Sequence, residues 1–169
     1  DRLLTVTFAL IAGVALLCTV GAEVLMRVFT RLQGPALHLA VEFAFLCMPQ
    51  VLFYGVFAVF GNLLNARGSF GPYGWAPVLN NVVAISGELA FLRLWGQQAD
   101  PSAWTGSMIL VLAGTASLGI LAQALVLVPV LARTGFRWRP RWGLRGYGFG
   151  QVGRFAGLTF LALCIAQGG

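Results

Sequence analysis

The chain has 169 residues, of which 59% are hydrophobic and 9% are charged, and its net charge is +6 at pH 7. Soluble domains usually contain about 25% charged residues, so this composition excludes a soluble globular domain and indicates an integral membrane protein. The positive charge does not indicate nucleic-acid binding, because basic loops are ordinary beside membrane spans and the sequence contains no nucleic-acid-binding motif.

Five apolar segments predict an all-α polytopic membrane protein, because about 20 apolar residues in a helix cross the hydrocarbon core of a bilayer. The segments cover residues 3–28, 39–64, 73–92, 106–132 and 151–169. The first is too long for a signal peptide and lacks a cleavage motif. Near its end, Glu23 and Arg27 are four residues apart and are expected to pair. The odd number of spans and the aspartate at position 1 indicate a fragment of a larger transporter-like protein.

A basic segment over residues 133–150 sets the expected orientation. It holds five arginines, which the positive-inside rule assigns to the cytoplasm: Arg133, Arg137, Arg139, Arg141 and Arg145. Alternation then places the amino terminus and the turn at Arg67 in the cytoplasm, and the loops at His38 and Asp100 outside. Three of the arginines are also expected to contact anionic lipid head groups: Arg137, Arg139 and Arg141.

Polar residues inside the second and third spans fall on one face of each predicted helix. At about 100° per residue, two stripes result: Gln50, Tyr54, Gly61 and Asn65 on the second span, and Pro77, Asn81 and Glu88 on the third. Asn80 lies about 100° from Asn81 and is placed to bond a neighbouring helix.

Two interpretations of these stripes are open. Amide side chains that bond across helices stabilise packing by about 0.6–2 kcal/mol each, which explains the stripes by helix contacts alone. Alternatively, the stripes line a substrate-facing cavity. Glu88 favours the cavity because charges inside a membrane usually face a pathway, and Arg93 is its nearest candidate partner along the chain. Pro49 and Pro77 permit kinks, as in the bent helices of transporters.

The fourth span contains no charge and is rich in small residues, which predict close helix packing: Gly106, Ala113, Gly114, Ala116, Ser117, Gly119 and Ala122. No catalytic, metal or cofactor site is predicted. His38 is the single histidine, the three cysteines stand alone in separate apolar segments, and no hydrolase or phosphate-binding motif occurs.

Two stretches resemble the MurJ/MviN family of lipid II flippases. The first is PQVLFYGVFAVFGNLLNARGSFGPYGWAPVLNNVV, residues 49–83, and the second is GFRWRPRWGLRG, residues 135–146. The Pro-Gln opening, Phe-Tyr-Gly, the Leu-Asn-Ala-Arg-Gly-x-Phe turn and Ala-Pro-Val-Leu-Asn-Asn carry the resemblance. The arginine-aromatic segment is similar to the actinobacterial branch. The chain would correspond to the third to seventh transmembrane spans of the family.

The resemblance implies a two-lobe multidrug/oligosaccharidyl-lipid/polysaccharide exporter-type fold. Residues 1–132 would belong to the amino-terminal lobe, 133–150 to a cytoplasmic linker and 151–169 to the carboxy-terminal lobe. It also implies that the protein is not an enzyme and uses no cofactor, and that it moves lipid II across the bacterial cytoplasmic membrane by alternating access. Membrane lipids and cell-wall synthesis proteins are the other implied partners.

The resemblance also bears on individual residues. Pro77 and Asn81 match the family's cavity-facing Pro-x-x-x-Asn, and Gln50, Asn65 and Glu88 are the further candidate cavity residues from the stripes. Two alternative functions are a related flippase or drug antiporter of the same fold, and a non-transporting cell-wall scaffold.

Overall fold

The computed structural model describes residues 2–98, 100–136 and 138–139, and within this part every regular element is helical. The elements are α1 (Arg2–Val20), α2 (Ala22–Phe29), α3 (Pro35–Cys47), α4 (Gln50–Asn65), α5 (Gly71–Trp95), the 3-10 helix η1 (Pro101–Ala103), α6 (Gly106–Leu125) and α7 (Leu127–Arg133). The predicted helix over 151–169 and most of the predicted linker over 133–150 lie outside the described residues.

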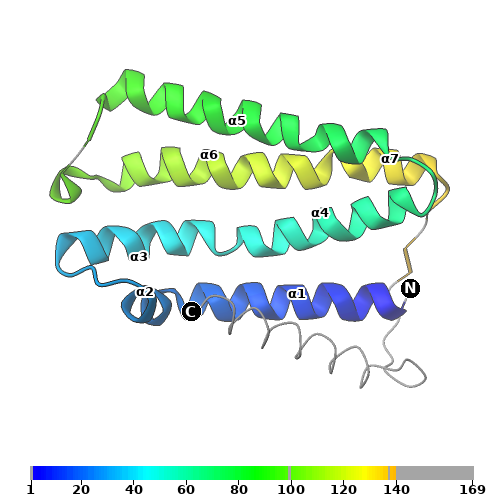
Figure 1. Cartoon of the computed structure of the whole chain (residues 1–169), viewed down its shortest axis with the longest axis horizontal. Coiled ribbons are helices and arrows are strands. Elements are labelled where there is room, and N and C mark those ends of the chain that lie inside the picture. Colours follow the sequence, from blue (N-terminus) through cyan, green and yellow to red (C-terminus); the bar gives the residue numbers. More distant parts are fainter. Residues whose placement is uncertain (1, 99, 137, 140–169) are drawn as a thin grey trace, which may run out of the picture. The chain divides into compact units, whose positions relative to one another are not determined.

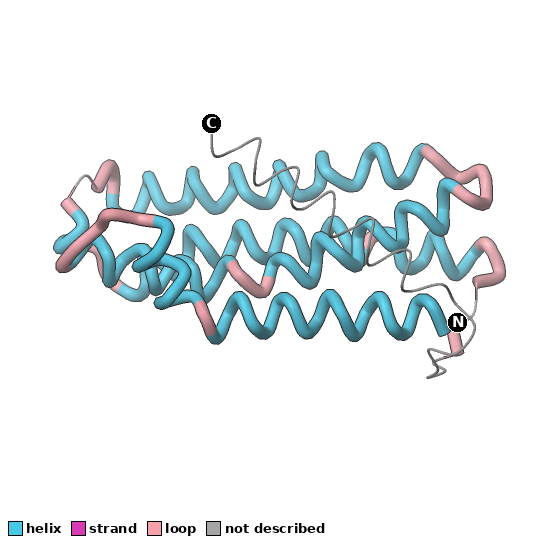
Figure 2. The backbone as a smooth tube through the Cα atoms, turned by 60° about the horizontal axis from the view of Figure 1, so that its bottom comes forward, coloured by secondary structure: helices cyan, strands magenta, loops and turns pink. Residues whose placement is uncertain are grey.

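Four helical stretches are long and apolar enough to cross a membrane: Arg2–Val20, Pro35–Asn65, Gly71–Trp95 and Gly106–Arg133. Residues 7–138 pack as one unit. Within it, α6 lies between α5 and the stretch formed by α3 and α4 (Figure 1). These helices run alongside one another, with the connecting loops at their ends (Figure 2). The structure therefore confirms an all-α membrane fold.

The first predicted span, 3–28, is divided into two helices. α1 ends at Val20, and α2 is seen nearly end-on in Figure 1 where α1 lies along the page. Gly21 separates them, and glycine is a poor helix former because its backbone loses the most freedom on ordering. The expected pair is present on α2, with Arg27 Nη2 at 2.8 Å from Glu23 Oε1. The helix breaks two residues before Glu23, the first acidic residue of the predicted span.

Two prolines divide the other long stretches. Pro49 stands between α3 and α4 and has no N–H to donate. Two residues later, Val51 N–H bonds the Met48 carbonyl at 3.1 Å, which is a tighter turn than an α-helix makes. Pro129 lies in α7, four residues after α6 ends at Leu125, where its ring would meet the Leu125 carbonyl. The kink expected at Pro49 is thus present.

Small residues let α5 and α6 approach closely, as the composition of the fourth span predicts. Gly87 of α5 faces Thr115 of α6, and Gly119 of α6 faces Asn80 of α5. A Cβ added at either glycine would overlap the opposing side chain. Ala113 on α6 is 2% exposed. This interface fixes which side of α5 is covered and which remains open.

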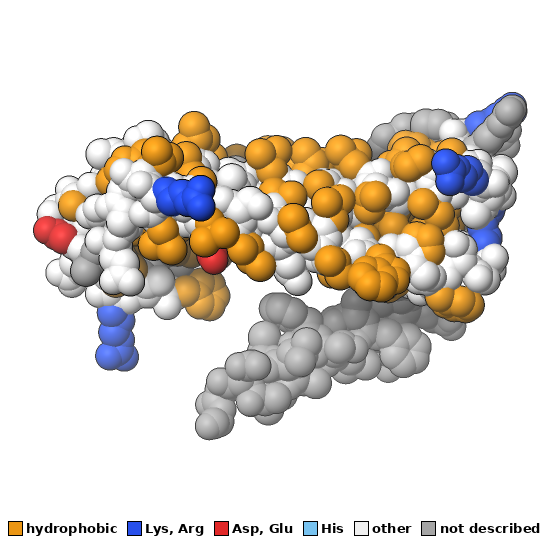
Figure 3. Space-filling view, turned by 90° about the horizontal axis from the view of Figure 1, so that it is seen from above, with side chains coloured by type: hydrophobic (Ala, Val, Ile, Leu, Met, Phe, Trp, Pro, Cys, Tyr) orange, Lys and Arg blue, Asp and Glu red, His pale blue; other side chains and the backbone are white. Residues whose placement is uncertain are grey.

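A buried apolar cluster lies where α4, α5 and α7 meet near the Arg67 turn. The buried cluster there consists of Leu64, Ala76, Leu127 and Leu131. Phe57 stacks on Tyr73 with ring centroids 4.8 Å apart, and the Tyr73 ring covers Gly61. Between the charged ends, the visible surface in Figure 3 is mainly apolar. Exposed residues such as Leu17 and Trp75 are suited to lipid contact rather than to water.

Candidate substrate-facing site

Two consecutive asparagines of α5 occupy different environments. Asn80 is half-buried and packs against Gly119 of α6. Asn81 is exposed, because a rotation of about 100° takes it off the α6 interface. Asn80 therefore packs against α6, although it makes no side-chain hydrogen bond among the described residues, and Asn81 lies on the open side of the helix.

The open side of α5 carries the predicted stripe. Pro77 is half-buried, and Asn81 and Glu88 are exposed. Pro77 lies inside α5 and cannot donate to the Tyr73 carbonyl four residues earlier. Asn81 lies about 15 Å from the start of α5, and Glu88 about 10 Å before its end at Trp95. Because the hydrocarbon core is about 30 Å thick, Asn81 lies near its middle.

Neither polar group of this stripe has a partner among the described residues. No described side chain hydrogen-bonds the Asn81 amide. In the described part, Glu23 pairs with Arg27, and His38 Nδ1 lies 3.5 Å from Glu42 Oε1, whereas the Arg93 guanidinium does not pair with Glu88. An amide and a carboxylate that protrude from a membrane helix need water or a polar ligand, because lipid chains offer neither.

Gln50 is used differently, in a hydrogen-bonded chain between helices. Its Nε2 donates to Ser117 Oγ of α6 at 2.9 Å, and Ser117 Oγ donates to the Leu46 carbonyl at 2.9 Å. Leu46 lies just before the kink at Pro49. Ser117 thus satisfies a carbonyl next to the broken helix, a recurrent role of serine in membrane helices that contain proline. These two hydrogen bonds hold α6 against the bend between α3 and α4.

Asn65 lies at the end of α4, and its Oδ1 is buried without a hydrogen-bond partner in the described part. The neighbouring turn is held by Arg67. Its Nη1 donates to the Thr134 carbonyl at 2.6 Å and to Thr134 Oγ1 at 2.9 Å, and its guanidinium lies 5.3 Å from the centroid of the Phe136 ring. The end of α7 is thereby tied to the turn between α4 and α5.

Sequence reasoning missed two of these residues. The sequence predicts Ser117 only as a small residue for helix packing. The signal that it bonds another helix is Pro49, whose missing N–H leaves a backbone carbonyl free for a hydroxyl donor. Thr134 had no signal, because its contact depends on the ends of α4 and α7 meeting in space. Of the arginines expected at lipid head groups, Arg137 and Arg141 lie outside the described residues, and Arg139 stands at the edge of the described part.

The model of the family described as lipid II flippase MurJ matches residues 1–168. No solved structure matches the chain. The match covers nearly the whole chain and agrees with its helical, membrane-spanning architecture. The chain therefore belongs to the MurJ family of lipid II flippases, which are transporters of a peptidoglycan precursor and not enzymes.

Proposed function

We propose that the face of α5 with Pro77, Asn81 and Glu88 forms one wall of the pathway along which the head group of lipid II crosses the bacterial cytoplasmic membrane. The observation that carries this proposal is the division between Asn80 and Asn81. The covered side of α5 already has its amide, Asn80, packed against Gly119 of α6. Helix packing therefore does not account for Asn81 and Glu88, which are exposed and without partners among the described residues.

The chemistry of lipid II suits this wall. Its head group carries sugars and a diphosphate, so it offers many hydrogen-bond acceptors and hydroxyl donors. The Asn81 amide has both donor and acceptor atoms and meets the head group near mid-membrane, where the low dielectric strengthens such bonds. The Glu88 carboxylate accepts from sugar hydroxyls and repels the diphosphate. Asn81 therefore holds the head group near mid-membrane. Near the outer end, repulsion between Glu88 and the diphosphate favours release of the head group.

Gln50 and Asn65 extend the proposed pathway along α4. The buried, unpartnered Oδ1 of Asn65 supports a role near the cytoplasmic end, since an incoming donor group would satisfy it. Gln50 is proposed to act in the bending of the helix rather than in binding of the head group, because its amide already donates to Ser117 beside the kink at Pro49. Alternating access requires helices to bend, and a kink held by two side-chain hydrogen bonds can open without unfolding either helix.

The arginine segment is proposed to hold the cytoplasmic end at the membrane surface. Arg137, Arg139 and Arg141 carry three positive charges within five residues. Each contributes about 1 kcal/mol near an anionic lipid surface. The same charges support the cytoplasmic orientation of this end.

The proposal is tested by replacing the two asparagines separately in the full-length protein, in cells depleted of their own flippase. Asn81→Ala is expected to reach normal membrane abundance but to rescue growth poorly. Asn81→Gln should rescue growth partly, because the longer amide retains both hydrogen-bonding atoms. Asn80→Ala is the matched control. It loses packing against α6, so its rescue should follow its abundance. Full rescue by Asn81→Ala at normal abundance would contradict the proposal.

A further inference from the structure

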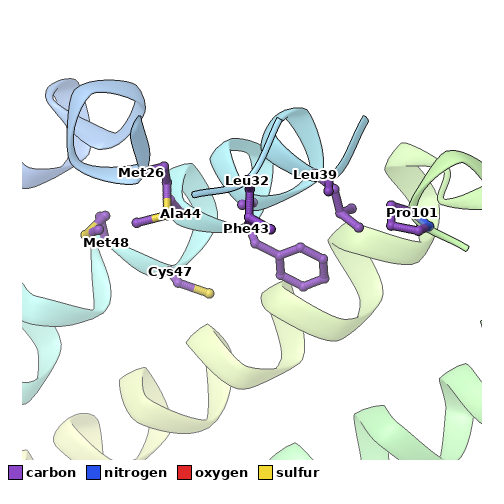
Figure 4. Close-up of a pocket in the computed structure, with 10 residues that line it drawn as sticks. Met26, Leu32, Leu39, Phe43, Ala44, Cys47, Met48 and Pro101 are labelled. Carbon is purple, nitrogen blue, oxygen red and sulfur yellow. The ribbon is translucent and has the colours of Figure 1, made fainter. Parts of the chain in front are cut away.

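A second feature of the molecule lies away from the α5 wall, at the corner between α2 and α3. It is an apolar groove of about 590 Å³, which is within the size range of small-molecule sites. The residues that line it are Met26, Leu32, Ala36, Leu39, Ala40, Phe43, Ala44, Cys47, Met48 and Pro101. Figure 4 shows Met26 from α2 opposite a row of side chains from α3. The row from Leu39 to Met48 extends for about 14 Å along the helix.

This groove continues into a polar pocket. The second pocket has a volume of about 310 Å³ and is lined by Pro35, His38, Leu39, Glu42, Pro101, Ser102 and Trp104. Leu39 and Pro101 line both spaces. The combined site is therefore amphipathic, with an apolar channel at one end and polar side chains at the other. A ligand that fits it has the same division.

The position of the site relative to the bilayer follows from its aromatic residues. Trp104 lines the polar pocket and stacks on Phe91 with ring centroids 5.2 Å apart. Phe91 in turn contacts Trp95 at the end of α5. Tryptophans concentrate at the level of lipid head groups. The polar pocket thus lies at head-group depth, and the groove descends from it along α3 into the hydrocarbon region.

The polar pocket has a definite charge pattern. The Glu42 carboxylate is 45% exposed and is the formal negative charge of the lining, and the His38 Nδ1 lies 3.5 Å from Glu42 Oε1. The His38 ring and the Ser102 hydroxyl supply donors. A carboxylate beside such donors complements a head group in which a positive ammonium is linked to a phosphate. An anionic head group without an amine would place its negative charge against Glu42 with no ammonium to offset the repulsion.

We propose that this site binds a phospholipid with a primary-amine head group from the outer leaflet. One acyl chain lies in the groove along α3. The ammonium pairs with Glu42, and the phosphate accepts hydrogen bonds from His38 or Ser102. This lipid would hold α2 and the loop before α3 at the membrane surface, independently of the transport pathway.

The test compares two lipids that differ only in the head group. The full-length protein in detergent is mixed with equal amounts of phosphatidylethanolamine and phosphatidylglycerol of the same acyl chains, and retained lipid is measured by native mass spectrometry. Wild-type protein should retain the ethanolamine lipid about three- to fivefold over the glycerol lipid. Glu42→Gln should remove this preference. Ala40→Phe fills the groove and should reduce binding of both lipids about tenfold.

Ala90→Phe is the matched control, because Ala90 is exposed on α5 near the same end of the bundle and lines neither pocket. It should bind both lipids as the wild type does. Equal retention of the two lipids by the wild type would overturn the head-group assignment, and unchanged binding by Ala40→Phe would overturn the groove. Thermal unfolding establishes that each variant is folded. Should Ala40→Phe not fold, Glu42→Gln at its partly exposed position still decides the head-group assignment.

Discussion

Ser117 illustrates how much a single hydroxyl contributes when no water is present. It accepts from Gln50 and donates to the Leu46 carbonyl, so three polar groups near mid-membrane are satisfied by one side chain. The sequence predicted that Gln50 either bonds a helix or lines a cavity. It did not predict Ser117 as the partner, because the two residues are 67 positions apart and meet only through the bend at Pro49.

Replacing Ser117 tests this role. Ser117→Ala should lower the free energy of unfolding by about 0.6–2 kcal/mol, the range measured for hydrogen bonds between membrane helices. Ser86→Ala is the control, because the Ser86 hydroxyl is exposed and bonds only the Val82 carbonyl of its own helix at 2.7 Å. Denaturation of both variants in mixed micelles gives the comparison. An equal loss in the two would show that the Gln50–Ser117–Leu46 chain contributes nothing specific.

Among the helices, the close pair α5 and α6 determines the site. The small residues of the fourth span predicted this contact, because small side chains are what permits two helix backbones to approach in a membrane. The sequence did not predict which helix is the neighbour, since a small-residue pattern names no partner. The structure supplies it through Gly87 with Thr115 and Gly119 with Asn80.

Two glycines of α6 give a prediction of opposite sign. Gly119→Ala should destabilise the protein by about 1–3 kcal/mol, because the new methyl group overlaps Asn80, whose backbone carbonyl also lies 2.9 Å from that position. Gly114→Ala should be neutral or stabilise by up to about 1 kcal/mol, because the nearest atom would be Leu110 Cδ1 at 3.8 Å and alanine favours helix. Thermal unfolding midpoints distinguish the two. Similar midpoints would mean that α5 and α6 are not this close.

Helix boundaries were predicted less well than helix existence. Hydropathy extended the first span to Val28, although α1 ends at Val20. The cause is that Val24, Leu25 and Val28 are as apolar as any spanning residue. Their helix, α2, departs from the direction of α1 after Gly21 and presents Val24 and Val28 on an exposed surface. Apolar content alone does not distinguish a helix that crosses a membrane from one that lies at its edge.

For the molecule as a whole, the loops that the charge rule assigns to one side of the membrane lie at the same end of the helices. Arg67 bonds Thr134, so the turn after α4 and the end of α7 lie at the same end. His38 and Ser102 line one pocket at the other end. Four stretches that are long and apolar enough to cross a membrane, joined by loops at alternating ends, produce this arrangement.

Single cysteines test the orientation in the full-length protein after its native cysteines are replaced by alanine. Ser102→Cys should react with an impermeant thiol reagent added to intact cells, because Ser102 is exposed and its loop is predicted to lie outside. Ala66→Cys, in the exposed turn beside Arg67, should react only after the cells are opened. Reaction of Ala66→Cys in intact cells, with protection of Ser102→Cys, would invert the assigned topology.

The candidate site was predicted in part. Helical periodicity placed Pro77, Asn81 and Glu88 on one face and Asn80 on another, and the structure assigns Asn80 to the α6 contact. Periodicity cannot tell a face that lines a pathway from one that meets a further helix, because both exclude lipid. That distinction depends on which neighbours cover the face, so it requires coordinates and experiment.

The central claim, that the Asn81 face of α5 lines an aqueous pathway, is tested most directly by cysteine scanning along this helix. In the cysteine-free full-length protein, cysteines at Gly74, Asn81 and Glu88 lie on one face. Cysteines at Trp75, Val82 and Leu89, each one position later, lie on the neighbouring exposed apolar face. A small, water-soluble thiol reagent should label the first set at least about tenfold faster, because a thiol ionises and reacts only where water reaches it. Equal labelling of the two sets, or faster labelling of the second, would contradict the claim.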